Sequence, residues 1–147
     1  MFMGPKPVIF RMSAAAPLTN PIRSYRDLRV WQQAIQLVES TYRVTRSFPE
    51  TERYGLVNQL RRAAVSVASN IAEGHARSTG DYVRHLVIAN GSLAEIETQL
   101  IVSNRLGYLG KAEIEPLLDG CDQIGRMLGT LRRRLRARRS QTLSPNP

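Results

Sequence analysis

The sequence predicts an all-α protein, an antiparallel up-down-up-down four-helix bundle, on three observations. Apolar residues recur every three or four positions in four successive segments, which is the spacing of an amphipathic helix. No segment alternates apolar and polar residues in the manner of a strand. Only a few residues link one segment to the next, and short links make neighbouring helices antiparallel. We therefore divide the chain into a disordered N-terminal tail (1–23), the bundle (24–136) and a basic, disordered C-terminal tail (137–147).

The first helix is predicted to begin at Ser24, because Ser24 and Asp27 have the spacing of a capping box. The Phe48-Pro49 pair ends it, since helices usually stop before a proline. The residues expected to face inward are Leu28, Trp31, Ile35, Val38, Tyr42 and Thr45.

The second helix is expected from about Thr51 to Glu73, with Gly74 just beyond its end as the terminating residue. Many of its residues are alanine or serine, so its surface is thin and another helix can approach it closely. The residues expected to face inward are Leu56, Leu60, Ala64, Val67 and Ile71.

The third helix follows Ser78, which has the position of an N-cap, and the fourth runs from about Lys111 to Arg136 or later. Cys121 falls on the inward seam of the fourth helix and is expected to be a buried structural thiol rather than a nucleophile. The other inward residues are Tyr82, Leu86, Ala89, Leu93, Ile96, Leu100, Ser103 and Gly107 on the third helix, and Ile114, Leu117, Ile124, Leu128, Leu131 and Leu135 on the fourth.

The basic residues are concentrated at the two ends of the chain. Twenty-one Lys and Arg residues against twelve Asp and Glu residues give a formal net charge of +9. Residues 1–26 carry +4, residues 123–147 carry +7, and the segment between them carries −2. Polyanions are therefore the first partners to consider, and they would meet the ends of the chain first.

The residue patterns of common enzyme classes are absent from the sequence. It has no glycine-rich phosphate loop, no HExxH motif and no GxSxG motif. A single cysteine excludes an intrachain disulfide and Cys-based zinc sites within one chain, and His85 is expected to form a surface pair with Asp81. No apolar run approaches the roughly 20 residues of a membrane span. We expect a non-enzymatic, cytoplasmic protein without a metal or another cofactor.

A row of polar residues runs along the second helix at spacings of three and four. Such a row is either a solvent face or a hydrogen-bonded contact with another helix. We favour the contact, because a solvent face is usually dense in lysine and glutamate whereas this row is mostly short and uncharged. The third helix adds apolar residues off its main seam, among them Val87 and Ile101, which favours association of the bundle with copies of itself. The polar row comprises Gln59, Arg62, Ser66, either Ser69 or Asn70, and Glu73.

The clearest candidate for a binding site is a run of arginines near the C-terminus. Guanidinium groups bind phosphates bidentately, so this run is a candidate nucleic-acid-binding site, and the alternative is a nonspecific solubilising tail. Most of the aromatic residues have core spacing, so we expect contacts to the nucleic-acid backbone rather than base stacking. The candidate residues are Arg126, Arg132, Arg133, Arg134, Arg136, Arg138 and Arg139.

Four separated motifs give the chain a resemblance to a known family. They are the run Tyr25-Arg-Asp-Leu-Arg-Val-Trp-Gln-Gln-Ala34, Tyr54-Gly-Leu followed by Gln59-Leu-Arg-Arg-Ala-Ala64, Ser69-Asn-Ile-Ala-Glu-Gly74, and Gly91-Ser-Leu-Ala-Glu-Ile-Glu97. In this order they resemble the four-helix-bundle proteins encoded in 23S ribosomal RNA intervening sequences, over about residues 24–136. That family is similar in fold to the accessory variability protein of diversity-generating retroelements.

The resemblance implies a homopentameric barrel with a non-enzymatic role near RNA. Two functions stay open: binding of RNA or single-stranded DNA through clustered arginines, and a protein adaptor, such as an accessory subunit of a retroelement reverse transcriptase. We expect the family signature positions to be architectural, with Gly91 permitting a close helix approach. These positions are Asn70, Glu73, Gly74, Gly91, Ser92 and Glu95.

Overall fold

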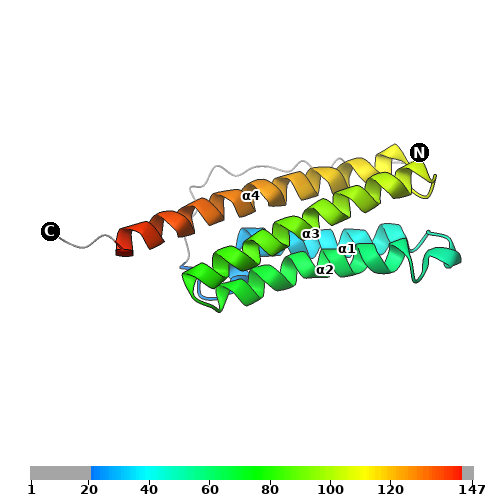
Figure 1. The fold of residues 1–147 in the computed structure, drawn as a ribbon. Coiled ribbons are helices and arrows are strands. Elements are labelled where there is room, and N and C mark those ends of the chain that lie inside the picture. Colours follow the sequence, from blue (N-terminus) through cyan, green and yellow to red (C-terminus); the bar gives the residue numbers. More distant parts are fainter. Residues whose placement is uncertain (1–20, 144–147) are drawn as a thin grey trace, which may run out of the picture.

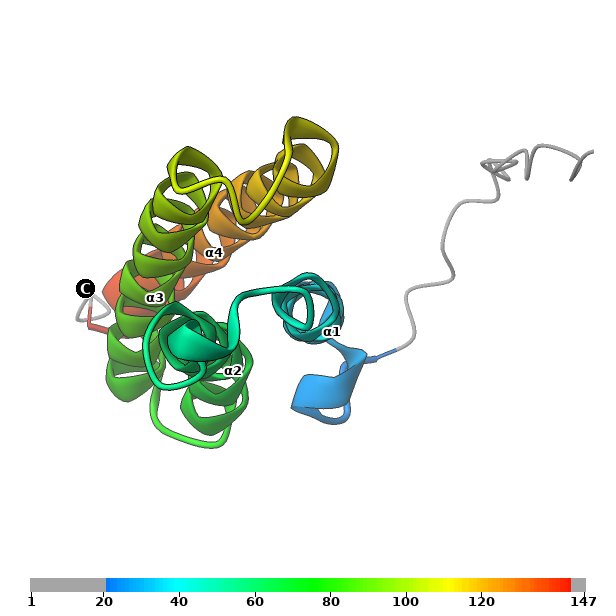
Figure 2. The same ribbon diagram turned by 90° about the vertical axis from the view of Figure 1, so that its right-hand side faces the viewer.

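In a computed structural model, which describes residues 21–143, the chain forms four α-helices, two short 3-10 turns and no strand within that range. The expected all-α fold with four helices is confirmed. Successive helices run in opposite directions, and each packs on two others, α1 and α3 each lying against both α2 and α4 (Figures 1 and 2). The elements are η1 (Tyr25–Asp27), α1 (Arg29–Thr45), η2 (Glu50–Glu52), α2 (Leu56–His75), α3 (Thr79–Arg105) and α4 (Lys111–Leu143).

The inward seams expected for α3 and α4 form the centre of the core. Every expected α3 position from Tyr82 to Ser103 is buried, and on α4 only Leu131 is half-buried rather than buried. Gly107 lies beyond the helix and has a φ of +80°. Its N–H and the N–H of Tyr108 bond to the carbonyls of Asn104 and Ser103, which is the Schellman pattern that ends a helix at glycine.

The inward face of α1 differs from the expected one by about one position. The capping box of Ser24 and Asp27 is present, but it caps η1, and α1 begins at Arg29. Tyr42 is 40% exposed, so its placement in the core was wrong. Thr41 is buried instead, because its hydroxyl donates to the Leu37 carbonyl at 2.7 Å and so needs no water. The buried residues of α1 are Val30, Ala34, Leu37, Thr41 and Thr45.

The second helix starts later than expected and contains its glycine rather than ending before it. The Glu52 carboxylate accepts the Leu56 N–H at 3.0 Å, which caps the first turn of α2. Gly74 is buried inside α2, where an added Cβ would lie 2.8 Å from Cβ of His85 and 2.9 Å from Cδ2 of Tyr82. Close approach between α2 and α3 therefore requires glycine at Gly74. The close helix approach expected at Gly91 is not found within one chain, because an added Cβ there meets nothing within 4 Å.

The fourth helix continues to Leu143, beyond the expected boundary at residue 136. Residues 137–143 are helical rather than disordered, because arginine, alanine and leucine are good helix formers and no proline lies between Pro116 and Pro145. Of the tails expected at 1–23 and 137–147, residues 1–20 and 144–147 lie outside the described residues. Between residues 21 and 143, no helix has the length and apolar character needed to cross a membrane.

Candidate nucleic-acid interface

The C-terminal turns of α4 carry six arginines from Arg132 to Arg139, and the last three of them lie on a stretch with little cover from the rest of the bundle. Leu135 is the last buried residue of the helix, and all residues from 136 to 143 are exposed. Figure 1 shows α4 continuing past the turn that joins α2 to α3. Successive residues are rotated by about 100° around a helix axis, so these arginines surround the projecting end of α4.

These arginines have no acidic partner among the described residues. The four ion pairs found there involve other basic residues, and no Asp or Glu occurs after Asp122 in the sequence. The contacts that are present are neutral: Arg133 donates to the Thr130 hydroxyl at 3.2 Å. Because guanidinium groups stay charged at all physiological pH values, the end of α4 keeps its positive charge.

Arg126 differs from the other candidate arginines. It pairs with Asp122 at 3.0 Å one turn earlier on α4, so a carboxylate already offsets its charge. The preceding turns of α4 are acidic, and Glu113 and Asp119 line a cleft of about 550 Å³ against α1 together with Asp122. Arg43 and Arg126 also line this cleft, so its charge is mixed, and the candidate arginines without an acidic partner lie on the turns after Arg126.

The arginines at the end of α4 meet the N-terminus of α3. The guanidinium of Arg139 lies over Gly80, 3.3 Å from the place that a Cβ would occupy. Arg138 and Arg139 line a shallow recess of about 340 Å³ with Ser78, Thr79 and Thr142. The N-terminus of a helix carries partial positive charge, so the recess joins positive potential from two elements beside three hydroxyl groups.

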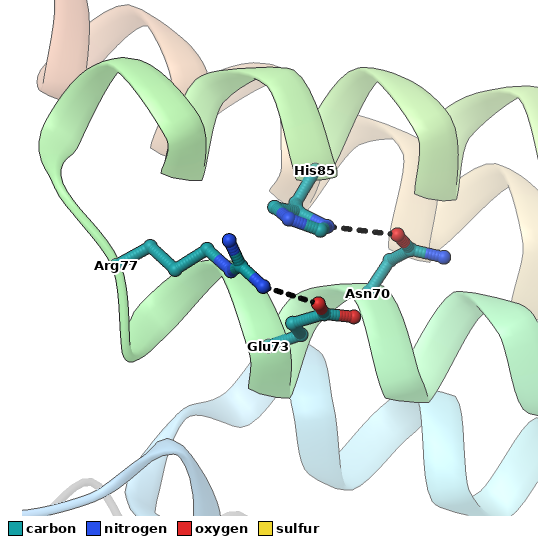
Figure 3. Close-up of polar contacts among 4 residues, drawn as sticks. All are labelled: Asn70, Glu73, Arg77 and His85. Carbon is teal, nitrogen blue, oxygen red and sulfur yellow. Dashed lines mark hydrogen bonds and ion pairs between the residues drawn. The ribbon is translucent and has the colours of Figure 1, made fainter.

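The polar row of α2 is a helix contact, and its partner is α3 of the same chain. The Ser66 and Ser92 hydroxyls lie 2.9 Å apart, and the side-chain nitrogen of Asn70 donates to the Ser66 carbonyl at 2.8 Å. Since this nitrogen is committed to Ser66, the Asn70 oxygen accepts from Nδ1 of His85 at 3.0 Å (Figure 3). This series of hydrogen bonds runs from Ser92 through Ser66 and Asn70 to His85 and crosses the α2–α3 contact twice. Ser92 and Asn70 therefore help to hold the two helices together.

The remaining residues of the polar row and the signature residue Glu95 lie toward the surface. Glu73 of α2 pairs at 2.8 Å with Arg77 in the turn after that helix (Figure 3), and Gln59 accepts from Gln99 of α3 at 3.2 Å. Arg62 and Glu95 are exposed and line one shallow depression between α2 and α3. The structure thus joins most of the polar row to α3 and leaves Arg62 exposed on the surface of α2.

The sequence-based prediction for Cys121 agrees with the structure, and the prediction for His85 does not. Cys121 is fully buried, and burial, reinforced by the Glu97 charge, raises the pKa of its thiol from 9.0 to about 12. The thiolate is therefore scarce, which agrees with a structural role. The expected pairing of His85 with Asp81 was wrong, because His85 turns to Asn70 on the neighbouring helix. No group of three or more potential metal ligands occurs in the part of the chain that the structure describes.

Sequence reasoning missed a surface groove between α1 and α2. Tyr54 is 85% exposed and Tyr42 40% exposed, and both line the groove together with three arginines. The available signal was the local pairing of arginine and tyrosine at Arg53-Tyr54, which helical periodicity does not register.

The chain is similar to known proteins in sequence and in fold. The sequence matches the family of the 23S rRNA-intervening sequence protein over residues 26–130, so the arginines after Leu131 lie outside the matched span. A crystal structure of a protein with unknown function from the S23 ribosomal protein family of Bacteroides thetaiotaomicron superposes with a TM-score of 0.63. The two are 21% identical, and the match covers 69% of this chain and 96% of that one. No curated protein matches the chain.

Proposed function

Because the chain belongs to the family of the 23S rRNA-intervening sequence protein, we propose that it is a non-enzymatic, self-associating bundle that binds RNA or single-stranded DNA. The arginines at the end of α4 contact the phosphate backbone. The observation that carries the proposal is the set of six arginines on the last turns of α4, three of them beyond its last buried residue, without an acidic partner among the described residues. The proposed location is the cytoplasm.

Self-association is proposed through the outer face of α3. Val87, Ile88, Ile101 and Val102 are each 40% to 46% exposed, and Gly91 opens onto space between them. One helix face that carries several exposed apolar side chains is typical of a contact between proteins. Five copies of a chain with net charge +9 would carry +45, so a pentamer would multiply weak phosphate contacts through a high effective concentration.

The same α3 face supports a second candidate function. A protein adaptor, such as an accessory subunit of a retroelement reverse transcriptase, would use this apolar surface for its partner and hold nucleic acid secondarily. Salt separates the two functions, because phosphate contacts weaken steeply as salt rises and an apolar contact persists.

The test is binding to a labelled structured RNA and a labelled single-stranded DNA, measured by fluorescence anisotropy. The variant changes Arg134, Arg136 and Arg138 to Gln, and its control changes Arg29, Arg43 and Arg46 to Gln. All six residues are exposed, so both proteins lose three charges and keep the core. We expect the first variant to bind roughly tenfold more weakly than the control. Equal affinity of the two would reject the proposed interface and favour the adaptor.

A further inference from the structure

We propose that the groove between α1 and α2 binds the bases of a single-stranded polynucleotide, so that the protein has a second contact with nucleic acid apart from the end of α4. This inference rests on the proposed function and deepens it. The Tyr–Arg groove is defined by Tyr42, Arg53, Tyr54, Arg61, Arg62 and Val65 and has a volume of about 640 Å³.

The groove joins exposed apolar surface to positive charge. Tyr54 is 85% exposed, Tyr42 40% and Val65 42%, so each leaves apolar surface in contact with water. No acidic side chain lines the groove, and no carboxylate among the described residues pairs with Arg61 or Arg62. An aromatic and anionic ligand complements both features, and a nucleotide has this chemistry.

Arg61 is fixed at the α1 side of the groove. Its Nε donates to the Thr45 hydroxyl at 3.0 Å, and its guanidinium carbon lies 4.5 Å from the centre of the Tyr42 ring. Such stacking leaves the planar guanidinium with further N–H donors that suit a phosphate oxygen. The residue is thus positioned before any ligand arrives.

Tyr54 is held by a short structured turn rather than by a loose loop. The backbone N–H groups of Glu52, Arg53 and Gly55 each bond to a carbonyl three or fewer residues earlier in that turn. The carboxylate of Glu52 also accepts the Leu56 N–H at 3.0 Å and the Tyr108 hydroxyl at 3.4 Å. An aromatic ring on a fixed backbone loses little conformational freedom when a base stacks on it.

The groove and the α4 arginines lie at opposite ends of the long axis. The groove is built from the last turns of α1, the turn before α2 and the first half of α2, whereas the end of α4 lies beside the α2–α3 turn (Figure 1). A strand that touched both would run along the bundle. The two contacts can therefore be removed separately, and their effects on affinity should add.

The test compares strands with and without bases. The probes are a labelled 12-nucleotide oligouridine RNA, the oligothymidine DNA of equal length and an abasic strand with the same number of phosphates. We expect Tyr54→Ala to weaken binding of the RNA and the DNA roughly 5- to 100-fold, because one base loses its stacking platform. Tyr54→Phe keeps the ring and should stay within about twofold of the wild type. Binding of the abasic strand should be the same in all three proteins.

Equal weakening of the abasic and base-bearing strands by Tyr54→Ala would overturn the inference. A change of oligomeric mass in Tyr54→Ala would also overturn it and would assign the groove to a contact between copies. Replacing the uridines by 5-iodouridine adds a direct readout, since ultraviolet crosslinks should map to Tyr42 or Tyr54 in the intact protein and nowhere else on α1 or α2. If the intact protein binds the oligouridine and the abasic strand with comparable affinity, the bases contribute nothing. The α4 arginines alone would then account for binding, and the inference would be overturned.

The RNA and DNA arms show whether the 2′-hydroxyl contributes to the contact. Equal losses on both strands support stacking on any single strand, and a loss confined to RNA supports a groove that selects RNA. The two proposals can fail separately. If the variant of Arg134, Arg136 and Arg138 binds normally while Tyr54→Ala weakens binding only of strands that carry bases, the proposed α4 interface is wrong and the groove proposal holds.

Discussion

The guanidinium carbon of Arg61 lies 4.5 Å from the centre of the Tyr42 ring, which joins α2 to α1 at the surface. Tyr42 has the spacing of a core residue, but it stands at the edge of the bundle and supports an arginine instead. The same bundle exposes a second group of arginines on α4. Two basic regions, one with aromatic rings and one without, thus occupy different ends of one small fold.

Replacing Gly74 by alanine should destabilise the bundle by about 1–3 kcal/mol, because the added methyl group meets His85 and Tyr82 below van der Waals distance. The free energy of unfolding in urea, read by circular dichroism, measures the change. Gly120→Ala is the matched control, since its Cβ meets nothing within 4 Å, and should be neutral or stabilising by up to about 1 kcal/mol. Equal effects at the two glycines would contradict the close approach of α2 and α3.

Removing the hydrogen bond between Asn70 and His85 should show coupling between the two positions. Asn70→Ala leaves Nδ1 of His85 without its partner and removes the side-chain bond to the Ser66 carbonyl, so we expect a loss of about 1–3 kcal/mol in unfolding free energy. The cycle with His85→Ala should give an interaction energy of at least about 0.5 kcal/mol. Strict additivity of the two substitutions would show that the contact does not stabilise the fold.

The buried thiol of Cys121 should make stability fall as pH rises from about 9 toward 12. The unfolded state loses this proton above its ordinary pKa of 9.0, whereas burial raises the folded pKa to about 12. The folded state therefore binds more protons in this window, and the unfolding free energy falls by up to about 1.4 kcal/mol per pH unit.

Urea unfolding of the wild type and Cys121→Ala at several pH values measures this slope. Burial also raises the pKa of Tyr82, so both proteins should lose stability at high pH, and the wild type should lose it more steeply. Parallel slopes for the two proteins would contradict the assignment to Cys121.

The outer face of α3 should control the oligomeric state. Val87→Glu combined with Ile101→Glu places two charges on exposed apolar positions, and we expect a monomeric mass in light scattering at micromolar protein with unchanged helix content. Ala112→Glu with Ser47→Glu is the control, since both residues are exposed on other elements. A wild-type protein that is itself monomeric would refute self-association.

Periodicity predicted the helices well where the core is built from large aliphatic residues, as along α3 and α4. It failed on α1, because Thr41 satisfies its hydroxyl within the helix and enters the core while the larger Tyr42 turns outward. The role of Gly74 and the bond between Asn70 and His85 depend on how two helices cross. Residue spacing along one helix gives no information about that crossing. The α4 arginines were predictable because charge is visible in the sequence. The Tyr–Arg groove was not, since it is assembled from α1, a turn and α2.

The salt dependence of nucleic-acid binding tests the central claim most directly. The affinity for a single-stranded 12-nucleotide probe is measured between about 50 and 200 mM salt for the wild type and for the variant of Arg134, Arg136 and Arg138. Three phosphate contacts on a single strand account for a slope of about 2 in a plot of log affinity against log salt, so the slope of the variant should be shallower by that amount. The control variant of Arg29, Arg43 and Arg46 should keep the wild-type slope. Identical slopes for all three proteins would contradict phosphate binding by the end of α4.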